Sequence, residues 1–169
     1  MAFFTENDFE RLDWRLLQNG SITLYWRTEF LEEDLQWLKG RGYRIDAFDC
    51  AKWEDETQLH RAFAESLQFP EYYGHNLDAL NDCLSDLEIP ESSGRVLIFQ
   101  RFDMVASKMP YVAGAVLNIL AGNARGFLLF GRRLIILIQS DDPKISFGPV
   151  GAQPVLWNSR EWLNKDRSL

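Results

Sequence analysis

The run LIILI, residues 134–138, is the most apolar stretch of the sequence that has the length of a β-strand. Five consecutive apolar side chains, without alternation, are typical of a strand that is buried on both faces. Such strands occur in parallel sheets with helices on both sides, because only then do both faces leave water. The run therefore predicts an α/β fold built around a parallel sheet.

Towards the N-terminus, residues 96–99 (VLIF) are the next short apolar strand, and a helix is expected between the two runs. This helix is predicted over residues 104–122, with a break or restart at Pro110, because proline lacks the backbone donor that a helix uses. Residues 122–131 fit either final helical turns or one arm of a hairpin, and the sequence leaves both open.

The N-terminal half adds two strands and four helices. Residues 22–26 and 43–48 are rich in β-branched and aromatic side chains, as strands are. Apolar residues at helical spacing predict helices over residues 7–18, 30–39, 55–67 and 76–87. Strands that alternate with helices indicate right-handed crossovers and a single α/β domain of the three-layer type.

The C-terminal tail has a different composition. After Gln139 the alternation of strands and helices stops, and prolines and glycines become frequent. The tail ends in a short helix that Ser159 is expected to cap. Trp157 and Trp162 are expected to pack back on the body of the domain.

Composition excludes several classes of protein. The 169 residues are 46% apolar and 25% charged, as in a globular protein with one substantial core, and the net charge of −7 argues against general nucleic-acid binding. The longest apolar stretch, residues 111–122, is shorter than a membrane span, and the acids of the opening MAFFTENDFE are unlike a signal peptide. We therefore expect a cytoplasmic protein without a membrane partner. Cys50 and Cys83 belong to no CxxC or His-rich motif, so buried free thiols and no metal site are expected.

Negative charge is concentrated in residues 46–91, which hold twelve acidic and two basic residues. This segment carries a charge of −10, and the rest of the chain carries +3. A concentrated acidic surface attracts a basic partner and speeds the encounter with it. A solvated face that keeps the protein soluble would have the same composition, so both interpretations stay open.

The helix predicted over residues 76–87 separates its leucines from its aspartates. A core-facing stripe is formed by Leu77, Leu80, Leu84 and Leu87, with Cys83 at its margin. The opposite face carries an acidic row with two polar neighbours: Asp78, Asp82 and Asp86, beside Asn81 and Ser85. Like charges at this spacing repel one another, by a few tenths of a kcal/mol per pair. The row indicates either a surface for a basic partner or an ordinary solvated face.

The loop PEYYGHN, residues 70–76, leads into this helix. Tyr72 and Tyr73 can supply a rigid aromatic contact, and at least one of them is expected in the core. Gly74 is expected to allow a positive φ or a close backbone approach, and Asn76 to cap the helix.

The run PEYYGHNLDALNDCL, residues 70–84, resembles the signature of the barstar family, intracellular inhibitors of secreted bacterial guanyl-type ribonucleases. It departs from that signature only at His75 and Asn81. The order of strands and helices in the family fits residues 43–139. The resemblance thus implies a barstar-like parallel sheet with helices packed on it.

The resemblance also implies a binding mechanism that needs neither catalysis nor a cofactor. A family member covers the ribonuclease active site with this loop and helix, and the carboxylate that matches Asp82 occupies the phosphate site as the central anchor. The predicted partner-binding residues, with the acidic row included, are Tyr72, Gly74, Asn76, Asp78, Ala79, Asn81, Asp82, Ser85 and Asp86. Because a ribonuclease site must be basic to stabilise a phosphoryl transition state, a rigid row of carboxylates can compete with the RNA backbone.

Three departures set this chain apart from the family pattern. Asn81 stands where the family has a tryptophan, and His75 replaces an acid, which could add a pH dependence. A further interface acid of the family has no counterpart in residues 118–133. This stretch instead contains three arginines, Arg125, Arg132 and Arg133.

Two segments are additions to the family domain. Residues 1–42 form a helix–strand–helix extension of the same domain, and residues 140–169 form the tail with its short helix. The extension either recruits another partner or only extends the sheet, and we favour the second.

Two other functions are compatible with parts of the sequence. An enzyme would have to use Asp78, Asp82 and His75, with or without a divalent metal, and one helix face lacks convergent partners for catalysis. A binding module for a different basic partner, such as another toxin nuclease or a regulator, is favoured by Asn81 and by the missing acid. The sequence predicts a barstar-like immunity protein against a secreted or toxin-type ribonuclease, and leaves the target nuclease and the oligomeric state undetermined.

Overall fold

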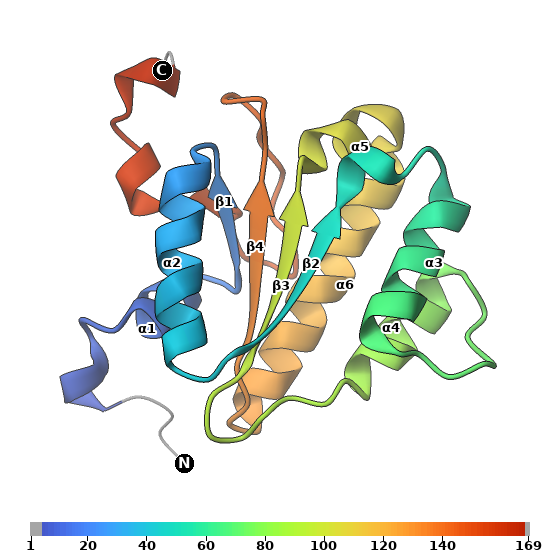
Figure 1. Ribbon diagram of the computed structural model, residues 1–169, viewed down its shortest axis with the longest axis horizontal. Coiled ribbons are helices and arrows are strands. Elements are labelled where there is room, and N and C mark those ends of the chain that lie inside the picture. The colour runs from blue at the N-terminus through green and yellow to red at the C-terminus, as the bar shows by residue number, and fades with distance from the viewer. Residues whose placement is uncertain (1–4, 168–169) are drawn as a thin grey trace.

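The computed structural model describes residues 5–167. Its centre is a five-stranded sheet in the order β2-β3-β4-β1-β5, with every pair of neighbours parallel (Figure 1). The strands are β1 (Ile22–Tyr25), β2 (Arg44–Asp49), β3 (Arg95–Gln100), β4 (Leu134–Gln139) and β5 (Leu156–Trp157). The predicted α/β fold with a parallel sheet is confirmed. The first four residues, on which the leader prediction partly rests, lie outside the described residues.

The most apolar run of the sequence is the central strand. All six residues of β4 are buried, between β3 on one side and β1 on the other. Alternate side chains enter two separate clusters: Leu134, Ile136 and Ile138 on one face, and Ile135 and Leu137 on the other. Both faces are therefore covered, as the unbroken apolar run predicts.

Helices form a layer on each side of the sheet (Figure 1). The larger cluster is covered by α3 (Glu56–Leu67), α4 (Leu77–Ser85), α5 (Phe102–Lys108) and α6 (Pro110–Leu129). The other face is covered by α1 (Leu12–Leu17) and α2 (Thr28–Gly40). Short 3-10 turns occur at Glu6–Asp8, Cys50–Lys52, Ser159–Glu161 and Lys165–Arg167. The three-layer arrangement matches the prediction.

The helix α6 resolves the ambiguity over residues 122–131, because it continues to Leu129. It starts at Pro110, where the restart was predicted. By length and apolar composition alone α6 would suffice to cross a membrane, so the expectation of a shorter stretch is wrong. Its inner side packs on the larger cluster through Val116 and Leu120, and buried core helices commonly pass the same test. The absence of a membrane partner stays a prediction.

The first predicted helix is wrong in its N-terminal half. Only a 3-10 turn forms at Glu6–Asp8, and α1 starts at Leu12. Between them Arg11 has an extended backbone, with ψ of 140°. Its guanidinium donates hydrogen bonds to Asp8 and to Asp13, so the ion pairs stabilise a turn where apolar spacing alone predicts helix.

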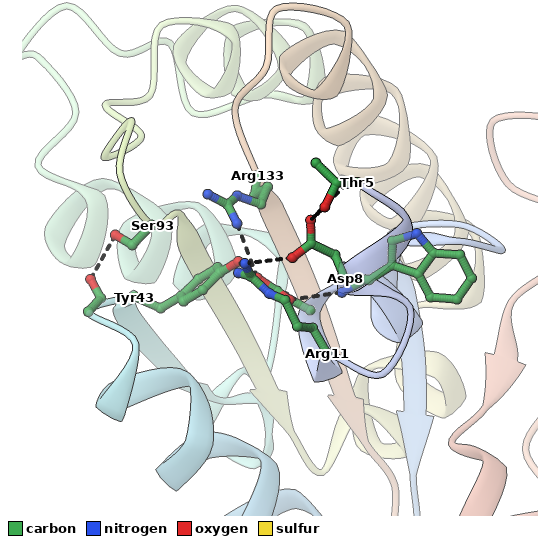
Figure 2. A network of polar contacts seen from close by, with 9 residues as sticks. Thr5, Asp8, Arg11, Tyr43, Ser93 and Arg133 are labelled. Atoms are coloured by element: carbon green, nitrogen blue, oxygen red, sulfur yellow. Dashed lines mark hydrogen bonds and ion pairs between the residues drawn. The ribbon is translucent and has the colours of Figure 1, made fainter. Parts of the chain in front are cut away.

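A buried carboxylate joins the N-terminal unit to the rest of the sheet. Asp13 is fully buried and accepts hydrogen bonds from the Tyr43 hydroxyl (2.7 Å), from Arg11 Nη2 (2.7 Å) and from Arg133 Nη1 (3.1 Å); Figure 2 shows these donors converging. Burial opposes ionisation of Asp13, but the hydrogen bonds from Arg11 and Tyr43 outweigh it and lower the pKa of this carboxyl. With β1 inserted between β4 and β5, the extension lengthens the sheet. The boundaries at residues 42 and 139 stay predictions.

The tail adds a strand that the sequence did not predict. β5 pairs with β1, and Trp157 packs on the larger cluster as expected. Trp162 is instead about half exposed. The following turn is capped by Asn158, whose Oδ1 accepts from the backbone N–H of Arg160, so the predicted cap at Ser159 is wrong.

Candidate functional site

The helix α4 is built as its sequence predicts at the start and ends earlier than predicted. Asn76 Oδ1 accepts the backbone N–H of Ala79 at 2.8 Å, which confirms the predicted cap. The last helical residue is Ser85, and Asp86 already leaves the helix. The predicted end at residue 87 is therefore wrong, although Leu87 is buried as expected.

The acidic row, which runs along α4 and ends at the C-cap residue Asp86, faces solvent. Asp78, Asp82 and Asp86 are exposed, and within the described part of the chain none of them forms an ion pair. Their neighbours Asn81 and Ser85 are exposed as well. On the opposite side Leu80 and Leu84 are fully buried, whereas Leu77 is only half-buried. The segregation of leucines from aspartates therefore holds in the folded chain.

Other acids of residues 46–91 are neutralised by bases of the same chain. Four ion pairs of 2.5 to 3.2 Å do this: Asp46 with Arg95, Asp49 with Arg101, Glu54 with Lys108, and Glu91 with Arg132. Each of these bases comes from a later part of the sequence, outside the acidic segment. The acidic row is thus not neutralised by these bases, which bind acids elsewhere in the segment.

The two tyrosines of the loop have opposite environments. Tyr72 is 84% exposed, whereas Tyr73 is 5% exposed and lies in the larger cluster. The backbone N–H of Tyr73 donates to the Pro70 carbonyl at 2.9 Å, which closes the turn. One tyrosine therefore anchors the loop, as expected, and the other is available for a contact.

The backbone of the loop differs from the prediction at one residue. The left-handed conformation occurs at His75, with φ of 50°, and not at Gly74. A Cβ at Gly74 would lie 3.1 Å from Asn76 Nδ2 and 3.3 Å from the Cβ of Ala79. Of the two roles predicted for Gly74, the close approach is confirmed and the positive φ is wrong.

Two residues near the site were not predicted. His60 on α3 is buried, and its Nδ1 lies 2.5 Å from the Tyr73 hydroxyl. Helical spacing puts His60 three residues before Phe63, on the apolar face, and this is the signal that could have found it. Asn123 on α6 donates to the Oδ1 of Asn81 at 3.0 Å, so α6 borders the predicted surface. A polar residue inside a mostly apolar helix was the signal that could have found it.

The missing interface acid of the family has no acidic replacement in residues 118–133, the C-terminal part of α6 and the turn after it. Arg125 is exposed there, and Arg132 and Arg133 bind the chain's own acids Glu91 and Asp13. A partner that approaches α4 from this side meets a neutral amide at Asn123.

The chain's possible metal ligands and its thiols have defined positions in the fold. Among residues 5–167, no group of three or more His, Cys, Asp or Glu side chains could hold a metal ion. Cys50 and Cys83 are free thiols, and burial raises the pKa of both. Cys83 is only half-buried, so the expectation of a buried thiol holds for Cys50 alone.

Fold and surface together define an α/β protein with a parallel sheet that presents an unpaired acidic row and a loop with one exposed tyrosine. The model of the family described as Barstar (barnase inhibitor) matches residues 43–139, more than half of the chain. The chain belongs to this family, and the resemblance seen in the sequence is confirmed over the expected range. The contact roles of the individual site residues stay predictions.

A similar curated protein comes from Bacillus subtilis (strain 168), where it is named "Putative ribonuclease inhibitor YrdF". The two chains are 33% identical over 73 residues, which is 43% of this chain and 76% of that protein.

Proposed function

We propose that this protein is a barstar-like ribonuclease inhibitor that covers the active site of its target with the loop at residues 70–76 and with α4. Membership of the Barstar (barnase inhibitor) family supports the inhibitor function, as does the name of the Bacillus subtilis relative. The observation that supports the acidic mechanism most strongly is that the carboxylates of the acidic row are exposed and form no ion pairs in the described chain. Asp78, Asp82 and Asp86 are exposed and unpaired, while acids on β2 and at Glu54 are already bound to the chain's own bases.

The chemistry follows from what a ribonuclease must hold. Its active site carries basic side chains that bind the phosphate and stabilise the charge of the transition state. Carboxylates fixed on a capped helix present negative charge at regular spacing without the entropic cost of ordering a flexible chain. Asp82 lies in the middle of the row, where a partner desolvates it most completely. Removing its carboxylate would leave the partner's cations unpaired and weaken binding by about 2–5 kcal/mol.

The proposal extends to the cell. An inhibitor of a secreted or toxin-type ribonuclease protects its producer when it meets the enzyme inside the cytoplasm, so we place this protein there as an immunity protein. The function requires one-to-one binding and no turnover. The second candidate is a binding module for a different basic protein, favoured by Asn81 in place of the family's tryptophan and by the absence of an acid in residues 118–133.

Calorimetric titration of barnase tests the acidic mechanism with matched variants. Asp82→Ala and Glu65→Ala each remove one carboxylate from an exposed helical position that has no ion pair in the described chain. Asp82→Ala is expected to weaken binding at least about thirty-fold, and Glu65→Ala to change it less than about three-fold. Equal effects of the two variants would show that only overall charge matters, and would overturn the role of α4.

A further inference from the structure

A buried histidine–tyrosine pair lies directly behind the loop of the proposed surface. His60 on α3 is 1% exposed and Tyr73 is 5% exposed. The Tyr73 hydroxyl lies 2.5 Å from His60 Nδ1, and the two rings are 5.8 Å apart. This pair is the side-chain hydrogen bond through which the loop reaches α3.

The partners of His60 define its protonation. Its Nε2 lies 3.3 Å from Glu56 Oε1 on the same helix. All three groups are satisfied when the ring is neutral, Nε2–H donates to the Glu56 carboxylate, and the Tyr73 hydroxyl donates to Nδ1. A protonated ring would turn Nδ1 into a donor and leave the buried hydroxyl hydrogen of Tyr73 without this acceptor.

The loop needs such an anchor because its backbone is not held by regular structure. Gln68, which ends α3, and His75 both have the left-handed conformation, with φ of 56° and 50°. Between them the Tyr73 ring meets Phe69 edge-to-face, with 4.9 Å between ring centroids, and it lies tilted against His75, with 4.8 Å between ring centroids. Tyr73 is thus the one loop side chain that reaches both ends of the turn and also the core.

We propose that His60 is a positioning residue for the partner-binding loop: by holding the Tyr73 hydroxyl, it fixes the turn that presents Tyr72 and starts α4 at Asn76. The effect on loop order concerns the free protein alone. The effect on affinity rests on the proposed inhibitor function, since it requires a partner that binds this loop.

The same contact makes the loop sensitive to pH. The titratable groups that face His60 are Glu56 on its own helix, and Tyr73 and His75 on the loop. Burial, the largest influence, lowers the pKa of His60 despite the opposing effect of Glu56. Protonation of His60 is therefore coupled to loss of the hydrogen bond that the Tyr73 hydroxyl donates, and loop order falls as the pH falls through the lowered pKa.

The test compares four variants. His60→Leu fills the site without an acceptor, and His60→Gln restores an acceptor for the Tyr73 hydroxyl. Tyr73→Phe removes only the hydroxyl and keeps the ring. Ile135→Val, on the opposite face of the sheet, is the control for general destabilisation. Amide hydrogen exchange of residues 69–77 is measured in the free protein at pH 7.5, and the affinity for barnase is measured in parallel.

We expect His60→Leu and Tyr73→Phe to speed loop exchange about ten-fold, with no further effect when they are combined. His60→Gln should recover most of the protection, and Ile135→Val should leave the loop unchanged. In the native protein, the rate of loop amide exchange, corrected for the intrinsic pH dependence of exchange, should rise between pH 7.5 and 5.5. This rise should disappear in His60→Leu.

Unchanged loop protection in both His60→Leu and Tyr73→Phe would overturn the positioning role, whatever barnase does. Faster loop exchange with undiminished affinity for barnase would show that the positioning of the loop by His60 does not matter for binding. If native protein fails to bind barnase while loop exchange responds as expected, the proposed target is wrong and the positioning role in the free protein stands.

Discussion

Asn123 on α6 donates its side-chain N–H to the Oδ1 of Asn81 on α4, at 3.0 Å. Asn81 occupies the position where the family pattern has a tryptophan, so a mutual amide contact replaces a large exposed aromatic ring. The same nitrogen of Asn123 also reaches the Ile119 carbonyl at 3.0 Å, so Asn123 keeps an acceptor when Asn81 is replaced. Variants of this pair therefore test how asparagine in place of the family's tryptophan affects binding.

The first prediction concerns affinity. Asn81→Trp should tighten binding to barnase by about ten-fold, because an aromatic side chain at an interface contributes more contact area than an amide. Dissociation rates from surface plasmon resonance measure the change. Asn123→Ala, which removes the partner of Asn81 without adding a ring, should change the rate by less than about three-fold. Weaker binding of Asn81→Trp would indicate a partner shaped to the amide pair.

The second prediction concerns the buried carboxylate of the N-terminal unit. Asp13→Ala should lower the free energy of unfolding by about 3–5 kcal/mol, because Arg133 and the Tyr43 hydroxyl lose their buried acceptor. Urea unfolding at neutral pH gives the difference. Glu33→Ala breaks an exposed ion pair with Arg160 and should cost less than about 1 kcal/mol. A comparable loss in the two variants would contradict the structural role of Asp13.

The fold was predictable where the pattern is long and regular. The run at residues 134–138 identified a strand buried on both faces, the run at residues 96–99 identified a second apolar strand, and apolar spacing identified the helices. Helix ends and short strands were less predictable, because they depend on contacts between residues. The Arg11 ion pairs shorten the first helix. The two-residue strand β5 forms because it pairs with β1.

The site was predictable in composition and less so in geometry. Helical periodicity put the aspartates opposite the leucines, and cap chemistry identified Asn76. Sequence spacing could not show that acids on β2 are bound to Arg95 and Arg101, since these bases come from distant residues. It also placed the left-handed residue at Gly74 rather than at His75, where ring contacts with Tyr73 stabilise it.

The third prediction concerns pH. The pKa of His60 is lowered from its ordinary value of 6.5 by burial, so the unfolded chain takes up a proton at a higher pH than the folded one. Its contribution to stability is full above pH 6.5 and is lost as the pH falls through the folded pKa. Urea unfolding from pH 7.5 to 5 should show this loss. His60→Gln should flatten the curve in that range, and an identical slope in the variant would assign the loss to other groups.

The fourth prediction concerns the start of α4. Asn76→Ala removes the acceptor of the Ala79 N–H and should lower the free energy of unfolding by about 1 kcal/mol, whereas Asn76→Asp keeps an acceptor and should cost less. Thermal or urea unfolding of both variants measures the difference. Because the cap sets the direction of the acidic row, Asn76→Ala should also weaken barnase binding more than Asn76→Asp does. Equal affinities of the two variants for barnase would show that the cap stabilises the protein without affecting binding.

The most direct test of the central claim is the cleavage of RNA by barnase, titrated with the native protein and with Asp82→Ala. Inhibition by this surface predicts that cleavage falls to zero at one equivalent of native protein, and that Asp82→Ala needs a large excess for the same effect. Undiminished cleavage in the presence of excess native protein would contradict inhibition of this enzyme. The acidic helix would then belong to a different basic partner.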